Sequence, residues 1–215
     1  MMMTKNFIHV SARRSLSGMF TTLLLHVTLA VPPAALPPGV LKAAVIEAAA
    51  VWAPYGVAVD AAAPCSAAPD DSTILTIVVV QERQAAATAS WHRPLGAMSF
   101  ASDGAPSPTI TVFLTGIQQL IAATPGLGAA EKASPPARHD QMVGRVVGRV
   151  VAHEIGHFLL RTPQHTAAGL MRSLQRADEL EAPWGRGFTL SPAEAARLPL
   201  AKAPSDRPVM TEVRP

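Results

Sequence analysis

The pattern of hydrophobic and polar positions predicts a chain of mixed helices and strands. From Val40 to Ala53 apolar residues recur three and four positions apart, which places them on one face of a helix that Pro54 ends. The run Thr73–Val80 is rich in β-branched residues and almost continuously apolar, as expected of a buried strand. Three further strands and a short helix are predicted, in order, at Gly56–Ala63, Gly96–Ala101, Thr109–Leu114 and Thr115–Ala123.

The second half of the chain predicts a long helix and then a short one. Asp140 is a suitable N-cap for a helix that continues to about Arg161, ahead of Pro163, and valines give it an apolar side. The segment Ser191–Glu194 has the sequence of a capping box with proline at the first helical position. We therefore expect a short helix from this segment to about Leu198.

The N-terminal residues predict a secretory signal peptide. Lys5, Arg13 and Arg14 form a basic region, and the 13-residue run Met19–Val31 is mostly apolar. This run is shorter than the roughly 20 residues of a membrane span, although an uncleaved signal anchor is the alternative. Residues 1–35 are thus the predicted leader, residues 36–199 the domain and residues 200–215 a loose tail. A secreted or periplasmic location follows, with membrane contact only through the export signal.

Composition and charge narrow the function classes. Hydrophobic residues make up 49% and charged residues 15%, which is typical of a globular protein. Without the three basic residues of the leader, 15 Lys and Arg balance 15 Asp and Glu, so nucleic acid is not an expected partner. The single cysteine, Cys65, excludes an internal disulfide and a multi-cysteine zinc site. We expect a monomer.

The segment His153-Glu154-Ile155-Gly156-His157 carries the candidate chemistry. On a helix, histidines four residues apart lie on one face, where their imidazoles can share a metal ion. Zinc suits neutral imidazole, and a catalytic zinc site has three protein ligands and a water in the fourth position. Glu154 can reach that water as a general base, taking its proton and passing it to a leaving amine.

Two kinds of residue compete for the position of third ligand. His165 lies eight residues after His157, beyond the predicted end of the helix, where the chain can fold back towards the metal. Glu179 and Glu181 lie 22 and 24 residues after His157, and a downstream glutamate completes gluzincin-type sites. The histidine is favoured because imidazole is a fitting zinc ligand and a Gly-Leu-Met turn follows it.

With these residues the chain resembles the metzincin clan of zinc metallopeptidases, and within it a matrixin-like catalytic domain. The family has the motif HExxHxxGxxH followed by a methionine turn below the metal. The resemblance implies that His153, His157 and His165 bind zinc, that Glu154 is the base and that Met171 is the turn methionine. Two departures are present: Leu160 stands where the family has glycine, and the interval to the third histidine is two residues longer.

The resemblance implies an α+β, zincin-like fold in which a twisted mixed sheet packs on the zinc helix. It also implies that the edge strand Gly96–Ala101 binds a protein or peptide substrate by strand addition and that Arg172–Gly187 forms a wall of the specificity pocket. The expected function is an exported zinc endopeptidase. The alternatives are an exported zinc-binding protein without proteolytic activity and a gluzincin-type peptidase.

Overall fold

The protein is a mixed α+β structure in which one five-stranded sheet covers two long helices. This computed structural model describes residues 25–32, 34–61, 73–81, 94–124, 135–173, 179–180, 182 and 187–199. The elements follow in the order β1 (Leu25–Ala30), α1 (Pro38–Trp52), the 3-10 turn η1 (Ala53–Tyr55), β2 (Val57–Ala61), β3 (Thr73–Val80), β4 (Gly96–Phe100), β5 (Pro106–Phe113), α2 (Leu114–Ala123), α4 (Pro136–Leu160) and α6 (Pro192–Ala195).

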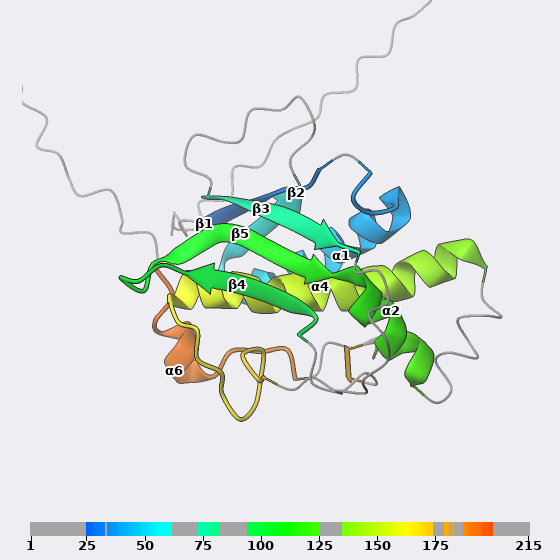
Figure 1. Cartoon of the computed structure of the whole chain (residues 1–215). Helices are drawn as coiled ribbons and strands as arrows, with labels where there is room; N and C mark the ends of the chain where they lie inside the picture. The colour runs from blue at the N-terminus through cyan, green and yellow to red at the C-terminus, as the bar shows by residue number, and fades with distance from the viewer. Residues whose placement is uncertain are drawn as a thin grey trace, which may run out of the picture.

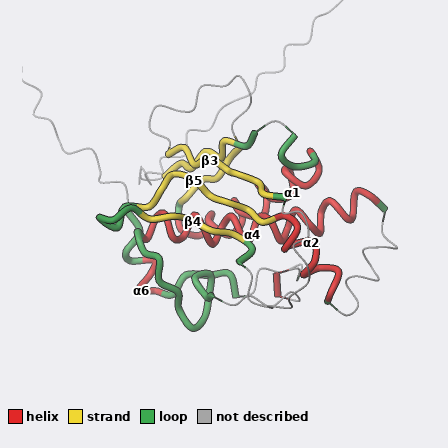
Figure 2. The backbone as a smooth tube through the Cα atoms, in the orientation of Figure 1, coloured by secondary structure: helices red, strands yellow, loops and turns green. Residues whose placement is uncertain are grey.

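The sheet has the strand order β2-β1-β3-β5-β4, and its first four strands are parallel. Only β4 runs antiparallel, paired with β5 at the edge that lies over α4 (Figures 1 and 2). The β-branched stretch Thr73–Val80 forms β3 over its whole predicted length. Successive side chains of a strand point to opposite faces of the sheet. Every second residue is therefore buried in the core: Leu75 and Ile77 of β3, and Ile110 and Val112 of β5.

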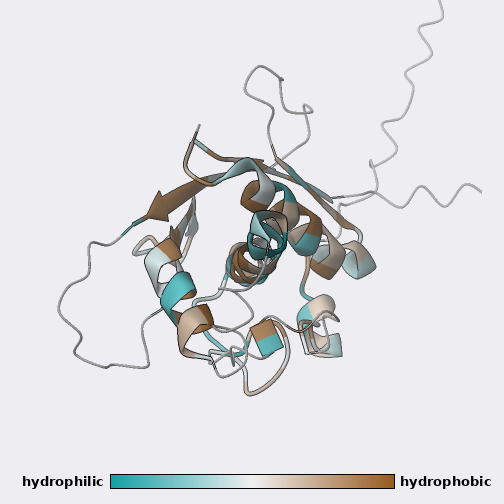
Figure 3. Ribbon diagram, turned by 90° about the vertical axis from the view of Figure 1, so that its right-hand side faces the viewer, coloured by the Kyte–Doolittle hydropathy of each residue, from teal (hydrophilic) through white to brown (hydrophobic). Residues whose placement is uncertain are grey.

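The two long helices lie directly against each other beneath the sheet. A Cβ atom added at Gly144 would lie 2.7 Å from the carbonyl oxygen of Val40, and one added at Gly148 would lie 2.5 Å from that of Ala44. The glycines of α4 therefore let its backbone approach α1 more closely than any side chain would allow. Figure 3 shows the sheet arched over these helices, with hydrophobic residues predominating in the strands.

Strand β1 corrects the predicted start of the domain. It lies between β2 and β3 and pairs with both, and its residues Val27 and Leu29 are buried in the core. These residues belong to the apolar run that predicted the leader, because a short apolar run is equally suitable for a signal peptide and for a buried strand. The described part of the domain therefore begins with β1 at Leu25, ahead of the predicted start at Leu36. Residues 1–24 and 200–215, assigned to leader and tail, lie outside the described residues.

The long helix begins five residues earlier than predicted, with its N-cap at Pro135 in place of Asp140. Pro136 occupies its first turn and Pro135 its N-cap position, so Asp140 is not the cap. Proline suits the first helical position because its missing N–H would have no partner there. Asp140 instead lies against Gly39 in the first turn of α1, where a negative charge is favourable. The predicted capping box of α6 is present, with Ser191 and Glu194 bonded to each other's backbone N–H groups.

None of the helices in the described part of the chain is long and apolar enough to span a membrane.

Candidate metal centre

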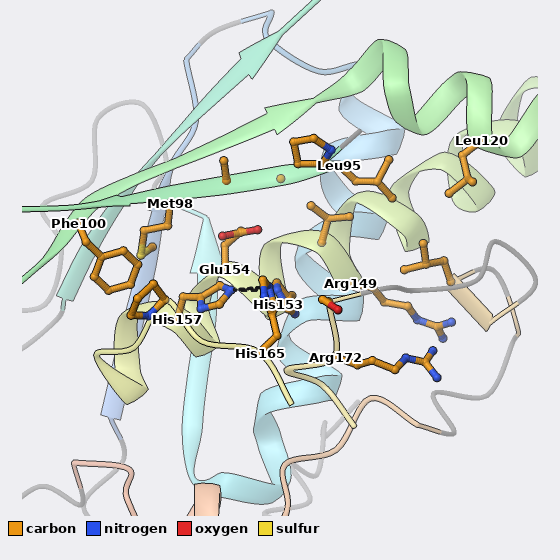
Figure 4. Close-up of a pocket in the computed structure, with 17 residues that line it drawn as sticks. Leu95, Met98, Phe100, Leu120, Arg149, His153, Glu154, His157, His165 and Arg172 are labelled. Atoms are coloured by element: carbon orange, nitrogen blue, oxygen red, sulfur yellow. Dashed lines mark hydrogen bonds between the residues drawn. The ribbon is translucent and has the colours of Figure 1, made fainter. Parts of the chain in front are cut away.

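Helix α4 and the loop that follows it bring three histidines together. His153 and His157 lie in the last two turns of the helix, and their ligand nitrogens and that of His165 all lie within 4.8 Å of one another. The chain leaves the helix at Arg161, which has the left-handed φ of 50°. The backbone turn for which glycine is suited thus occurs one residue after Leu160, at a non-glycine residue. It directs His165 back towards the helix (Figure 4).

Hydrogen bonds to carbonyl oxygens orient two of the three imidazoles. His153 Nδ1 donates to the carbonyl oxygen of Leu170 at 2.7 Å, and His157 Nδ1 donates to that of Thr162 at 2.7 Å. Because carbonyl oxygens only accept, each Nδ1 carries the proton and each Nε2 presents a lone pair. Outer-shell hydrogen bonds of this kind are typical of metal-binding histidines.

The distances between the Nε2 atoms fit a shared cation. His157 Nε2 lies 3.0 Å from that of His153 and 3.3 Å from that of His165. Nitrogens bound tetrahedrally at about 2.0–2.1 Å from one zinc ion would be roughly 3.3 Å apart. Lone pairs this close repel unless a cation lies between them. The three histidines can therefore hold a metal ion, and imidazole ligands suit zinc, copper, iron or nickel.

Burial keeps the histidines of the helix neutral. It lowers the pKa of His153 to about 4, against the opposing effect of the Leu170 carbonyl and with a smaller contribution from the neighbouring histidines. Burial also lowers the pKa of His157, again opposed by its bond to the Thr162 carbonyl. Neutral imidazole is the form that binds a metal, so the site is ready for a cation at neutral pH.

Glu154 lies beside the histidines but is not part of their cluster. Its side chain extends towards strand β4 in Figure 4, and a Cβ added at Gly96 would lie 2.8 Å from its Oε1 atom. Only 4% of the residue is exposed, and burial raises the pKa of its carboxyl from 4.5 to about 7. A carboxylate with a pKa near neutral pH is well suited to accept a proton and release it again.

This raised pKa predicts how the stability of the metal-free protein depends on pH. Between pH 4.5 and 7 the folded state keeps a proton on Glu154 that the unfolded state has lost, so its contribution to stability falls as the pH rises. At 1.36 kcal/mol per pKa unit, burial of the ionised carboxyl lowers the free energy of unfolding by roughly 3 kcal/mol above pH 7. In urea unfolding, metal-free Glu154→Gln should therefore be as stable as the metal-free wild type at pH 4 and more stable at pH 8. An equal stability difference at both pH values would contradict this.

Met171, which the metzincin resemblance names as the turn methionine, packs against the helix that carries His153 and His157. It is 1% exposed, and its sulfur occupies the space that a Cβ at Gly156 would need. The turn is held by a hydrogen bond from the Thr166 N–H to the Met171 carbonyl at 2.9 Å and by one from the Leu170 N–H to the Thr189 carbonyl at 2.8 Å. Since Leu170 also accepts from His153, this turn helps to orient a candidate ligand.

Of the two alternative glutamates, Glu179 has another partner. Its carboxylate forms an ion pair with Arg172 and it does not belong to the histidine cluster. Glu181 lies outside the described residues, as does Cys65. Within the described part of the chain, His165 is therefore the third residue that the fold brings to the pair on the helix.

A pocket of about 390 Å³ runs along the helix in front of the histidines. Met98 of strand β4 and Leu95, which precedes the strand, line one side of it. Pro163, Arg172 and Ser173 line it as well. Away from the histidines the lining is largely apolar and includes Leu120, Val150 and Leu180. The pocket therefore has an edge strand beside the candidate base and an apolar compartment next to it (Figure 4).

Three contributors to the site were not found by sequence reasoning. They are the Leu170 carbonyl, the absence of a side chain at Gly96 and the buried Arg149. The carbonyl and Gly96 carry no sequence signal of their own, because their roles depend on contacts between distant segments. Arg149 had a signal, because it and Arg145 are the two charged residues among the valines of the helix.

Searches against protein-family models, curated proteins and solved structures gave no match, so the residues and distances described above are what support a function.

Proposed function

We propose that this protein is a zinc-dependent endopeptidase of the metzincin type, with a matrixin-like catalytic domain. The observation that carries the proposal is the convergence of three Nε2 atoms next to a buried glutamate at the wall of a pocket. The long zinc helix, the mixed sheet with its antiparallel edge strand and the methionine under Gly156 are consistent with a zincin-like fold.

The residues divide the chemistry of hydrolysis among them. A zinc ion held by His153, His157 and His165 would supply an acidified water and polarise the scissile carbonyl. Glu154 takes the proton of that water and transfers it to the leaving nitrogen. The backbone of β4 aligns an extended peptide by strand addition, which satisfies the hydrogen bonds of any sequence.

We propose export because basic residues precede an apolar run near the N-terminus. The position of β1 restricts where such a signal peptide could be cleaved. The sheet keeps β1 only if a signal peptidase cleaves before Leu25. The substrate is then a protein or peptide encountered outside the cytoplasm.

Zinc analysis with matched variants tests the proposal. The purified chain should bind about one zinc and cleave casein, lose cleavage with a chelator and regain it with zinc. His165→Ala should lower zinc affinity by more than about 100-fold, since even outer-shell partners of a ligand are worth 10–100-fold. Glu179→Ala should keep its zinc because Glu179 pairs with Arg172. Loss of zinc in Glu179→Ala but not in His165→Ala would favour a gluzincin-type site. Zinc binding without any cleavage would favour a non-proteolytic protein.

The substitution Gly96→Ala is expected to lower the activity without removing the metal. A Cβ at this position would lie 2.6 Å from Val150 Cγ1 and 2.8 Å from Glu154 Oε1, so Gly96→Ala must displace the carboxylate. A displacement of about 1 Å can cost roughly 100-fold in rate, and we expect kcat to fall on that scale. Zinc content should not change. Ser99→Ala, at an exposed position of the same strand, is the control and should keep full activity.

A further inference from the structure

Arg149 is a buried arginine one helical turn before His153. Its side chain is fully buried, which is rare for a guanidinium without several partners. Nε donates to Glu47 Oε1 at 2.7 Å, and the guanidinium also stacks on the ring of Phe188, 4.6 Å from its centroid. The arginine therefore joins α1, α4 and the segment that follows the methionine turn.

The remaining donors of Arg149 hold the backbone of the pocket wall. One terminal nitrogen donates to the carbonyl oxygen of Glu179 at 2.6 Å and the other to that of Ala182 at 2.8 Å. Between these residues lies Leu180, which is 1% exposed and lines the pocket together with Val150. The arginine thus ties a wall of the pocket to the helix that carries the candidate ligands.

The charges at this end of the pocket are compensated. Arg149 pairs with Glu47, and Arg172 pairs with Glu179. Of the described residues at this end, Leu180 and Val150 present apolar surface, and the two arginines are each paired with a glutamate. The compartment accordingly fits an apolar residue.

We propose that Arg149 is a positioning residue: by holding the carbonyls of Glu179 and Ala182 it sets the width of the apolar compartment beside the candidate metal centre. This proposal rests on the proposed endopeptidase function. Arginine suits the role because its planar fork donates to Glu47 and to two carbonyls at once. A lysine at this position keeps the charge near Glu47 but lacks the fixed fork that spans both carbonyls.

Arg149→Lys and Arg145→Lys form a matched pair of variants. Arg145 lies one turn earlier on the same helix, and its Nε is 4.0 Å from the other oxygen of Glu47. It is not among the described residues that line the pocket. Both variants make the same chemical change, so a difference between them reports on the contacts of Arg149 with the wall.

The first measurement compares two zinc-binding probes on the zinc-loaded full chain: acetohydroxamate and a hydroxamate with an isobutyl side chain. Arg149→Lys should bind acetohydroxamate as the wild type does but lose about tenfold in its preference for the isobutyl probe, the scale at which apolar pockets discriminate. Arg145→Lys should change neither. An equal loss for both probes, or no loss for either, would overturn the proposal.

Kinetics and amide exchange separate this proposal from the proposed function. For a peptide with leucine after the scissile bond, Arg149→Lys should raise KM about tenfold with little change in kcat. For a peptide with alanine at the same position, KM should not change. A wild type that binds the probes but cleaves neither peptide would reject the peptidase function and leave the probe result valid. Independently of zinc, the amides of Leu180, Ala182 and Phe188 should exchange faster in Arg149→Lys than in Arg145→Lys, and equal exchange would overturn the proposal.

Glu47→Gln is the second variant if Arg149→Lys shows no cooperative thermal transition. It keeps an oxygen acceptor for Nε but removes the charge that fixes the guanidinium to α1. The isobutyl preference should then fall in the same direction while acetohydroxamate binding stays constant. An unchanged preference would contradict the role of Arg149.

Discussion

Replacing Glu154 by glutamine is expected to abolish peptide hydrolysis while the metal stays bound. The amide has the size of the carboxylate but cannot accept the proton of a water molecule, and loss of a general base costs roughly 100- to 10,000-fold in rate. Zinc should remain because the carboxylate faces Gly96 and is not part of the histidine cluster. The measurement is kcat on a fluorogenic peptide beside zinc content in the same preparation.

Two controls make this result specific. Asp60→Asn removes a carboxylate that is 66% exposed at its side chain, on strand β2, and should leave activity unchanged. His157→Ala should lose both zinc and activity, because it removes a candidate ligand. Equal rates of cleavage by the wild type and Glu154→Gln, with none by His157→Ala, would reject Glu154 as the base. Equal rates in all three proteins would identify a contaminating protease.

A chain that starts at Leu36 is expected not to fold. It lacks β1, so β2 and β3 lose their shared neighbour and the buried Val27 and Leu29 are missing. Each of these side chains contributes about 1.5–3 kcal/mol by burial alone, and the strand's backbone bonds to both neighbours are lost as well. Domains of this size are stable by only about 5–15 kcal/mol, so the sum is a large part of the total.

The matched control is a chain that starts at Thr22 and retains the whole of β1. It should show a cooperative thermal transition by circular dichroism, whereas the shorter chain should show none and be recovered as insoluble protein. If the protein is exported from its native cell, mass spectrometry should find an N-terminus before Leu25. A folded, zinc-binding chain from Leu36 onwards would show that β1 is dispensable and would restore the predicted leader of residues 1–35.

Much of the secondary structure could be predicted because its signals are local. The strand Thr73–Val80 has the same bounds in sequence and structure, and the capping box at Ser191 forms as expected. The spacing of His153 and His157 required only a helix to bring them together. Errors occurred where a local pattern has two physical solutions: an apolar run serves a leader or a strand, and Asp140 suits an N-cap or a neighbouring helix terminus.

The sequence by itself determined the helix, its two histidines and the glutamate between them, since residues a few positions apart are related by helical geometry alone. Tertiary structure decided the rest of the site. It brought His165 back to the helix through the turn at Arg161, paired Glu179 with Arg172, placed the Leu170 carbonyl on His153 and inserted β1 into the sheet. These contacts join residues that are distant in sequence, and their energy depends on packing and burial that no local pattern contains.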